Sequence, residues 1–258
     1  SLIVSDNDGA SHLATQQMLS LPVERISDGQ VLLYNFLEGS GSVINDLSGM
    51  GTPSNLGVSL NDTSWLSCGG LSIDQPTFIS SVEPPEKLIN AIQASNEITI
   101  EAWIKPDNIS QSGPARIVTY SKDGSKRNFT LGQKASNYDV RLRTSGTNDN
   151  GVQPNLSTSS NEVTTTLSHL IYTRDNGGQA KFYLNGLLTE TEQVSGLINN
   201  WGSDVEGYVF GLANETSNNR AWLGEYHLVS VYSRALLAGE VEHNYNMGLN
   251  NSCTNTAP

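Results

Sequence analysis

The stretch Ile98–Pro106 reads ITIEAWIKP, and apolar residues occupy every second position along most of it. Successive side chains of a β-strand point to opposite faces, so the three isoleucines and Ala102 share one face. Glu101 and Trp103 lie on the opposite face with the threonine and the lysine. Proline cannot donate to a ladder of backbone hydrogen bonds, so Pro106 ends the strand. The stretch predicts a strand with one face in a core and a more polar outer face.

Similar short runs recur on both sides of this strand, separated by turns rich in Gly, Asn and Asp. Asp175-Asn-Gly-Gly178 is expected to close a hairpin, and Asn185-Gly186 supplies the next tight turn. Short helices are expected over Pro85–Ala94 and Leu237–Asn246, and residues His12–Leu21 could form another before Pro22. The pattern predicts an all-β sandwich of two antiparallel sheets with one or two short helices. Strands are expected over 30–37, 71–73, 77–80, 98–105, 116–121, 128–133, 138–144, 167–174, 180–184, 208–212 and 225–232.

The 258 residues are enough for one large β domain with a core of its own. No repeat of fixed period and no interior linker divides the sequence. We expect an N-terminal extension or linker over 1–29, a β-sandwich domain over 30–248 and a C-terminal tail over 249–258.

The net charge is −12, and the sequence pI is about 4.6. This balance argues against a nucleic-acid partner, which would require a basic face, and against adhesion to anionic membranes. No stretch approaches the ~20 apolar residues of a membrane span, so membrane insertion is not expected. The many acidic and Asn side chains suit either simple solubility or Ca²⁺ binding.

The two cysteines, Cys68 and Cys253, show no metal-binding spacing. They are candidates for a disulfide that ties the C-terminal tail to the domain if the protein is secreted. Two half-buried thiols are the alternative.

Five residues are candidates for a carbohydrate site, because sugar sites combine aromatic platforms with planar polar groups. Arg141 and Arg143 share a face of one expected strand, Arg116 begins a neighbouring strand, and Arg220 and Trp222 follow the Asn-rich loop ANETSNN. These residues suggest a basic groove that receives an acidic polysaccharide on an otherwise acidic protein.

The alternative for the arginines is structural, since arginines among acidic residues often form ion pairs that tie strands together. The expected partners in that case are Asp139, Glu101 or Glu225.

Catalytic signatures are weak. Glu225 and His227 are expected on one face of a strand, and an acid beside a histidine is a common arrangement for proton transfer. Val229 and Val231 are expected on the same face, which favours a histidine packed in the structure over a catalytic one. No Glu-x-Asp-x-Glu run supplies the paired carboxylates of a retaining glycosidase. Glu190 and Glu192 do alternate, but they lie beside a turn.

Four segments in this order resemble the LamG-like jelly-roll domain, the laminin-G/pentraxin branch of the concanavalin A-like lectin and glucanase superfamily. They are LLYNFLEGSGSVINDLSGMG (32–51), ITIEAWIKP (98–106), SHLIYTRDNGGQAKFYLNG (168–186) and VFGLANETSNNRAWLGEYHLVSVYSRALLAGEV (209–241). The resemblance implies two curved antiparallel sheets and non-catalytic extracellular recognition of glycan or protein. The sequence also resembles a form of this domain found in large secreted or cell-envelope bacterial proteins, so we expect the chain to be a module of a larger protein.

The resemblance also implies structural Ca²⁺. Asp46, with Glu38 nearby in sequence, is the candidate ligand in the glycine-rich loop, and an Asx-turn is the alternative. Two positions depart from the family pattern. His227 stands where relatives often carry Asp, and Leu237 stands where the final helix often has a Ser cap.

Three functions therefore follow from the sequence. The first is carbohydrate recognition, the second is a structural spacer or protein adhesion domain without a sugar site, and the third is a degenerate glycoside hydrolase.

Overall fold

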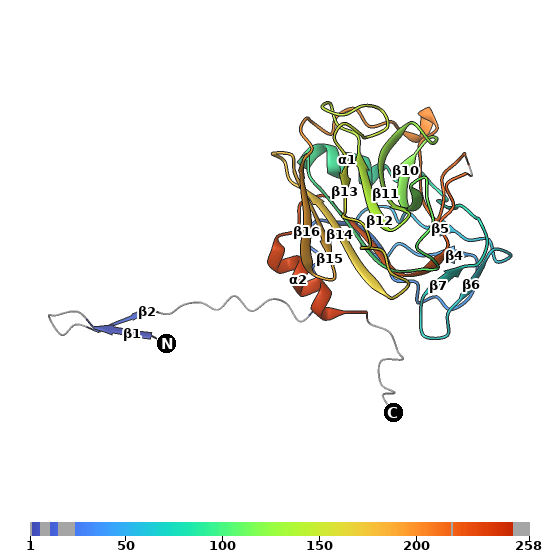
Figure 1. Cartoon of the computed structure of the whole chain (residues 1–258). Helices are drawn as coiled ribbons and strands as arrows, with labels where there is room; N and C mark the ends of the chain where they lie inside the picture. Colours follow the sequence, from blue (N-terminus) through green and yellow to red (C-terminus); the bar gives the residue numbers. More distant parts are fainter. Residues whose placement is uncertain (1, 6–10, 15–23, 218, 250–258) are drawn as a thin grey trace.

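The computed structural model describes residues 2–5, 11–14, 24–217 and 219–249 (Figure 1). Two eight-stranded antiparallel sheets pack face to face, which confirms the expected all-β sandwich. The first, called here the β10–β12 sheet, has in spatial order β13 (Leu156–Ser157), β12 (Asn137–Leu142), β11 (Arg127–Lys134), β10 (Ala115–Ser121), β17 (Val209–Leu212), β8 (Ile79–Ser81), β5 (Leu56–Gly57) and β4 (Val43–Ile44).

The second sheet, called the β9–β18 sheet, is built around the two longest strands. Its order is β16 (Leu187–Gln193), β15 (Gln179–Leu184), β14 (Ser168–Arg174), β9 (Ile98–Pro106), β18 (Gly224–Tyr232), β7 (Leu71–Ile73) and β6 (Thr63–Trp65), with β3 (Gln30–Tyr34) paired to the second half of β18. A separate hairpin joins β1 (Leu2–Ser5) and β2 (Ser11–Ala14).

Two α-helices occur in the described ranges, α1 (Glu86–Ser95) and α2 (Ala238–Met247), besides a short 3-10 turn, η1 (Asp204–Glu206). Each α-helix starts one residue later than its apolar spacing predicts. At α2 the Glu240 carboxylate accepts a hydrogen bond from the Leu237 N–H at 2.8 Å. A leucine side chain cannot return a second bond, so only half of the capping pair forms.

The core between the sheets follows the alternation of β9. Ile98, Ile100, Ala102 and Ile104 are fully buried in it, as the sequence predicts. Burying such side chains contributes about 1.5–3 kcal/mol for each large residue, which is what holds the two sheets together.

A β-bulge corrects one expectation on β18. The register against β9 shifts between Tyr226 and Leu228, so the strand gains a residue at that point. Val229 and Val231 therefore face the core, while His227 lies outside the core cluster. The predicted sharing of one face by His227 and the two valines is wrong because strict alternation breaks at the bulge.

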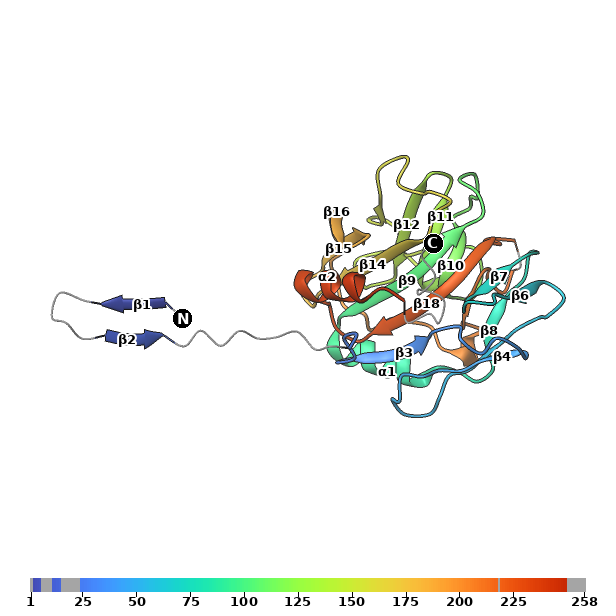
Figure 2. The same cartoon turned by 90° about the horizontal axis from the view of Figure 1, so that it is seen from below.

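The outer face of the β9–β18 sheet is covered by α2 and by the segment before β3 (Figure 2). Fully buried Glu101 accepts hydrogen bonds from the side chains of Arg25, Tyr232 and Asn244. His169 completes this network at 2.8 Å from Glu101 Oε1. Residues 24–29 thus pack on the sandwich, which begins before the expected boundary at residue 30.

No described helix is long and apolar enough to cross a bilayer.

Candidate functional site

The outer face of the β10–β12 sheet brings polar residues of three strands into rows. Arg116 on β10 lies opposite Gly132 on β11, which in turn lies opposite Asp139 on β12. Gly132 leaves the centre of this row without a side chain, and a Cβ there would approach the Ala115 carbonyl to 2.7 Å. Long side chains from the flanking strands can therefore lie across the sheet.

The next row continues this arrangement with small hydroxyl residues. Thr119 pairs with Thr130, which pairs with Arg141, and the two threonine hydroxyls lie 2.9 Å apart. The side chains on the sheet beneath the arginines are thus small and can form hydrogen bonds.

Arg116 forms a buried ion pair with Glu215, a residue 99 positions away in the β17–β18 loop. Its Nε and one terminal nitrogen lie 2.9 and 2.8 Å from Glu215 Oε2, and both side chains are fully buried. Burial lowers the pKa of Arg116 against the opposing effect of Glu215, and the charges of Arg141 and Arg220 lower it further. Arg116 therefore lies close to two more of the predicted arginines.

Arg141 and Arg143 follow one another on β12 and just beyond it, but they have different partners. Arg141 Nε donates to Asp139 at 2.8 Å, and its side chain is 15% exposed. Arg143 lies 2.9 Å from Asp149 and donates to the Tyr208 hydroxyl at 2.9 Å, and its side chain is 17% exposed. Asp139 was one of the ion-pair partners that the sequence suggested for these arginines, and the Arg141–Asp139 pair confirms it.

Arg220 lies against two glycines and pairs with no carboxylate among the residues that the structure describes. A Cβ on Gly113 would come within 2.8 Å of Arg220 Cδ, and one on Gly124 would lie 3.9 Å from a terminal nitrogen. Its Nε is buried without a hydrogen-bond partner. Arg220 is therefore a cation that the described structure leaves uncompensated.

Arg127, at the start of β11, is the member of this group that sequence reasoning missed. Its side chain is fully buried and donates to Thr130 Oγ1 at 3.3 Å and to the Gly124 carbonyl. Burial and the nearby charges of Arg116 and Arg141 lower the pKa of Arg127 to about 9. No described carboxylate pairs with it.

We call Arg116, Arg127, Arg141 and Arg220, with the carboxylates of Glu215 and Asp139, the arginine cluster. Four guanidinium groups against two carboxylates leave two positive charges at one place on a protein whose net charge is −12. Buried or half-buried charges without a counterion are costly, and strongly perturbed groups collect at functional sites. The cluster therefore carries more positive than negative charge.

Trp222 is a core residue rather than a sugar platform. Its side chain is fully buried, and the indole N–H donates to Gln133 Oε1 at 3.0 Å. A ring without exposed surface cannot stack on a sugar, so the prediction of Trp222 as a contact residue is wrong. The ring instead packs beside Tyr226 in the core.

Asp46 occupies a tight loop, and both of its carboxylate oxygens accept hydrogen bonds. The backbone N–H groups of Ser48 and Ser54 donate at 3.0 Å each, and Lys87 forms an ion pair. Burial alone would raise the pKa of Asp46, but these hydrogen bonds hold it below its usual value. The Asx-turn and the lysine thus occupy both carboxylate oxygens of Asp46.

Glu38 forms a separate contact, since its Oε1 accepts from the backbone N–H of Asn45 at 2.8 Å. Within the described ranges, no group of three or more His, Cys, Asp or Glu side chains could hold a metal ion. Calcium at Asp46 and Glu38 stays a prediction.

The expected disulfide also stays a prediction. Cys68 is half-buried in the turn between β6 and β7, and Cys253 lies outside the described residues.

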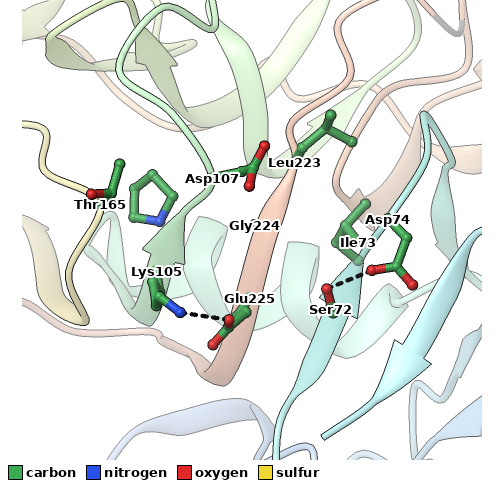
Figure 3. Close-up of a pocket in the computed structure, with 10 residues that line it drawn as sticks. Ser72, Ile73, Asp74, Lys105, Asp107, Thr165, Leu223, Gly224 and Glu225 are labelled. Atoms are coloured by element: carbon green, nitrogen blue, oxygen red, sulfur yellow. Dashed lines mark hydrogen bonds and ion pairs between the residues drawn. The ribbon is translucent and has the colours of Figure 1, made fainter.

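A pocket of about 300 Å³ lies where β7, β9 and β18 meet (Figure 3). Lys105 points to Glu225 and binds it at 2.7 Å, and Asp74 and Asp107 also line the pocket. Three carboxylates against one lysine make this pocket acidic. The lining of this pocket therefore disfavours an anionic ligand.

Glu225 and His227 do lie together, with His227 Nε2 3.3 Å from Glu225 Oε2. Glu225 also carries the Lys105 ion pair, which makes this a charged contact on the outer face rather than an isolated acid–base pair. Glu190, one of the two alternating glutamates on edge strand β16, accepts a hydrogen bond from Ser159 at 2.8 Å.

Comparison with known proteins places this fold in a family. The laminin-G-type family model described as "Concanavalin A-like lectin/glucanases superfamily" matches residues 80–242, so the chain belongs to this superfamily. The resemblance seen in the sequence is confirmed. No curated protein matched the sequence significantly.

Solved structures share the fold at low sequence identity. The receptor-binding domain of botulinum neurotoxin type G is 17% identical with a TM-score of 0.58, and the match covers 85% of this chain and 51% of that chain. A structure of botulinum neurotoxin type C, whose cell entry depends on interaction with two ganglioside molecules, has 14% identity, a TM-score of 0.58 and coverage of 85% and 51%. A Trypanosoma rangeli sialidase has 14% identity, a TM-score of 0.59 and coverage of 84% and 32%. The chain spans about half the length of the neurotoxin domains and a third of the sialidase.

Proposed function

We propose that this chain is a non-catalytic carbohydrate-recognition module and that the arginine cluster contacts an acidic glycan. The observation that carries the proposal is the positive charge left over at the cluster, where Arg127 and Arg220 have no described carboxylate partner. Guanidinium groups suit carboxylate and sulfate oxygens because their planar forks donate two parallel hydrogen bonds. An acidic sugar would supply the missing counter-charge.

The edges of the cluster are where such a ligand would make contact. Arg141 and Arg143 retain part of their surface, and Asn150, which accepts from Arg141 at 3.3 Å, extends the polar rim. Exposed Thr216 and Ser217 lie in the loop that carries Glu215 and add hydroxyl groups of the kind that pair with sugars. The ganglioside interaction described for one structural neighbour supports a sugar ligand in general terms.

The non-catalytic part of the proposal rests on how the two carboxylates of the cluster are engaged. Glu215 is held by Arg116, and Asp139 accepts from Arg141, Asn155 and Ser157. Carboxylates held as ion-pair and hydrogen-bond acceptors are poor general acids, because each donor favours their charged form.

A glycan array tests the proposal. Wild-type protein is compared with Arg141→Ala/Arg143→Ala and with Arg234→Ala, a control arginine that pairs with Glu240 beside α2. We expect wild type and control to bind uronate- or sulfate-bearing glycans and the double variant to bind them weakly. Absence of wild-type binding to every glycan would sink the carbohydrate proposal.

The second candidate is a structural spacer, and specific contacts favour it. Arg116 is locked in a buried ion pair, and Trp222 lies in the core, so two of the five predicted contact residues have structural roles. Under this candidate the array is blank, and removing either residue changes stability alone.

We further propose that the module acts outside the cell as part of a larger secreted or envelope protein. An acidic surface and membership of a lectin superfamily support this location. Fractionation of the native cells with an antibody to the module would decide it, and recovery in the cytoplasm alone would contradict it.

A further inference from the structure

Two arginines of the cluster meet at one loop. Gly124 lies in the turn between β10 and β11, where Arg127 donates to its carbonyl oxygen. On the other side, a terminal nitrogen and Nε of Arg220 lie 3.9 and 4.0 Å from the position that a Gly124 Cβ would occupy. The two guanidinium groups therefore both lie close to the same glycine, although they are 93 residues apart in sequence.

Both of these side chains retain unused donors. The Nε atoms of Arg127 and Arg220 are each buried and have no hydrogen-bond partner among the described residues. Neither arginine forms an ion pair there, whereas Arg116 and Arg141 each have a carboxylate. Buried polar groups are nearly always paired, so two orphan N–H groups beside one glycine point to a missing acceptor.

The Glu215 carboxylate, which lies close to Gly124, does not fill this role. Glu215 Oε1 would lie 3.3 Å from a Gly124 Cβ, but its recorded partner is the Ser217 hydroxyl at 2.7 Å. Its Oε2 is taken by Arg116. The local charge stays positive even with Glu215 in place.

We propose that Arg127 and Arg220 form an anion subsite beside Gly124 that holds one carboxylate or sulfate group of the glycan. This inference rests on the proposed function and deepens it, since it names the chemical group that is recognised and the two residues that bind it. An oxyanion there would accept from both orphan Nε–H groups and neutralise part of the surplus charge. Substrates without an acidic group would lack this contact.

Glycines make room for the subsite. Gly113 carries no side chain where Arg220 Cδ passes, and Gly124 has none between Arg220 and Glu215. Thr216 from the β17–β18 loop donates to the Lys122 carbonyl, so this loop contacts the β10–β11 turn. The ligand group would enter between these loops.

Thermal denaturation with simple anions tests the subsite without any glycan. Melting temperatures are measured with sodium glucuronate, sodium sulfate, sodium chloride at matched ionic strength, and neutral glucose. Sulfate stabilises many folded proteins by exclusion from their surface, so the difference between variants at the same salt is the readout. The variants are Arg127→Gln and Arg220→Gln, with Lys126→Gln as a control that removes one exposed charge from the same loop.

We expect glucuronate or sulfate to raise the wild-type melting temperature above the chloride value, and Lys126→Gln to respond equally. Each arginine variant should need about tenfold more anion for the same shift, as the loss of charge-assisted hydrogen bonds implies. A response to glucuronate alone identifies a uronate-type ligand, and a response to sulfate alone identifies a sulfate ester. If neither anion acts beyond chloride, or the arginine variants respond like wild type, the subsite is refuted.

Failure of this inference is distinguishable from failure of the proposed function. Array binding to neutral glycans that survives both arginine substitutions would leave carbohydrate recognition standing and remove the subsite. If the anion-dependent shifts in melting temperature vanish in both variants and the array shows no binding, the anion subsite is supported and the glycan is refuted as its ligand.

Discussion

Two buried arginines of the same cluster should lose very different amounts of stability on the same substitution. In Arg116→Met, the Glu215 carboxylate loses both guanidinium contacts while it stays fully buried, and only Ser217 remains as a side-chain donor. Removing one partner of a buried ion pair typically costs about 3–5 kcal/mol. We expect a loss of stability of this size for Arg116→Met.

Arg127→Met leaves no carboxylate behind. The substitution removes a cation whose pKa is lowered to about 9, together with hydrogen bonds to Thr130 and Gly124. Methionine keeps most of the packing of the arginine stem. The stability gained by removing a buried cation therefore nearly cancels the stability lost with the two hydrogen bonds. We expect a change within about 1 kcal/mol of wild type.

Urea unfolding at pH 7 measures both effects, with equal slopes confirming that only stability changed. The double variant Arg116→Met/Glu215→Leu supplies the matched control, because a buried pair replaced by apolar residues of similar size is often neutral. An Arg127→Met loss as large as that of Arg116→Met, or a double variant no better than the single one, would refute the assignment of paired and unpaired arginines.

Further predictions concern the core, the Asp46 loop and the buried histidine. Trp222→Ala should cost about 3–5 kcal/mol in urea unfolding, yet leave the glycan affinity of the folded protein unchanged, and a selective loss of affinity would restore its role as a contact. Because both oxygens of Asp46 are occupied, chelator should leave the melting temperature unchanged, and a fall would support the calcium site. Asp46, whose pKa is lowered, stabilises the fold above its unfolded pKa of about 3.9, and this stability is lost as the pH falls through its folded value, less so in Lys87→Met. Burial lowers the pKa of His169 despite Glu101, so below about pH 6.5 the unfolded chain binds a proton that folded His169 does not. Between pH 7.5 and 5, His169→Gln should therefore lose less stability than wild type in urea unfolding, and an unchanged difference would contradict a neutral His169.

Local patterns were enough to predict the sandwich and most of its longer strands. Strict alternation on β9 placed its isoleucines in the core, and the tight turn after Asp175 closed the β14–β15 hairpin as expected. The pairing of Arg141 with Asp139 is likewise local, since the two residues lie two apart on one strand. These features depend on neighbours in sequence, which is why a single sequence contains them.

The arginine cluster depends on contacts that no local pattern contains. Glu215 reaches Arg116 from a loop 99 residues away, and the Trp222 indole reaches Gln133 over 89 residues. Arg127 faces the outer side because the register shifts at the end of β10, where Ser121 pairs with it. A shift of one residue reverses the face of a side chain, so alternation alone could not assign Arg127.

The β18 bulge shows the same limit. Strict alternation predicted that His227 and Val229 share one face of the strand. The residue inserted at the bulge places them on different faces. A bulge has no sequence signature in this stretch, and its cost is repaid by packing of Tyr226 and Val229 that only the folded sheet contains.

The most direct test of glycan recognition at the arginine cluster follows the Nε–Hε signals of the arginines by NMR during titration with an acidic oligosaccharide of galacturonate. Signals of Arg127 and Arg220 should shift and saturate together, while that of Arg234, paired with Glu240, should stay in place. Saturable binding that leaves the signals of Arg127, Arg220 and Arg141 unchanged would contradict the account.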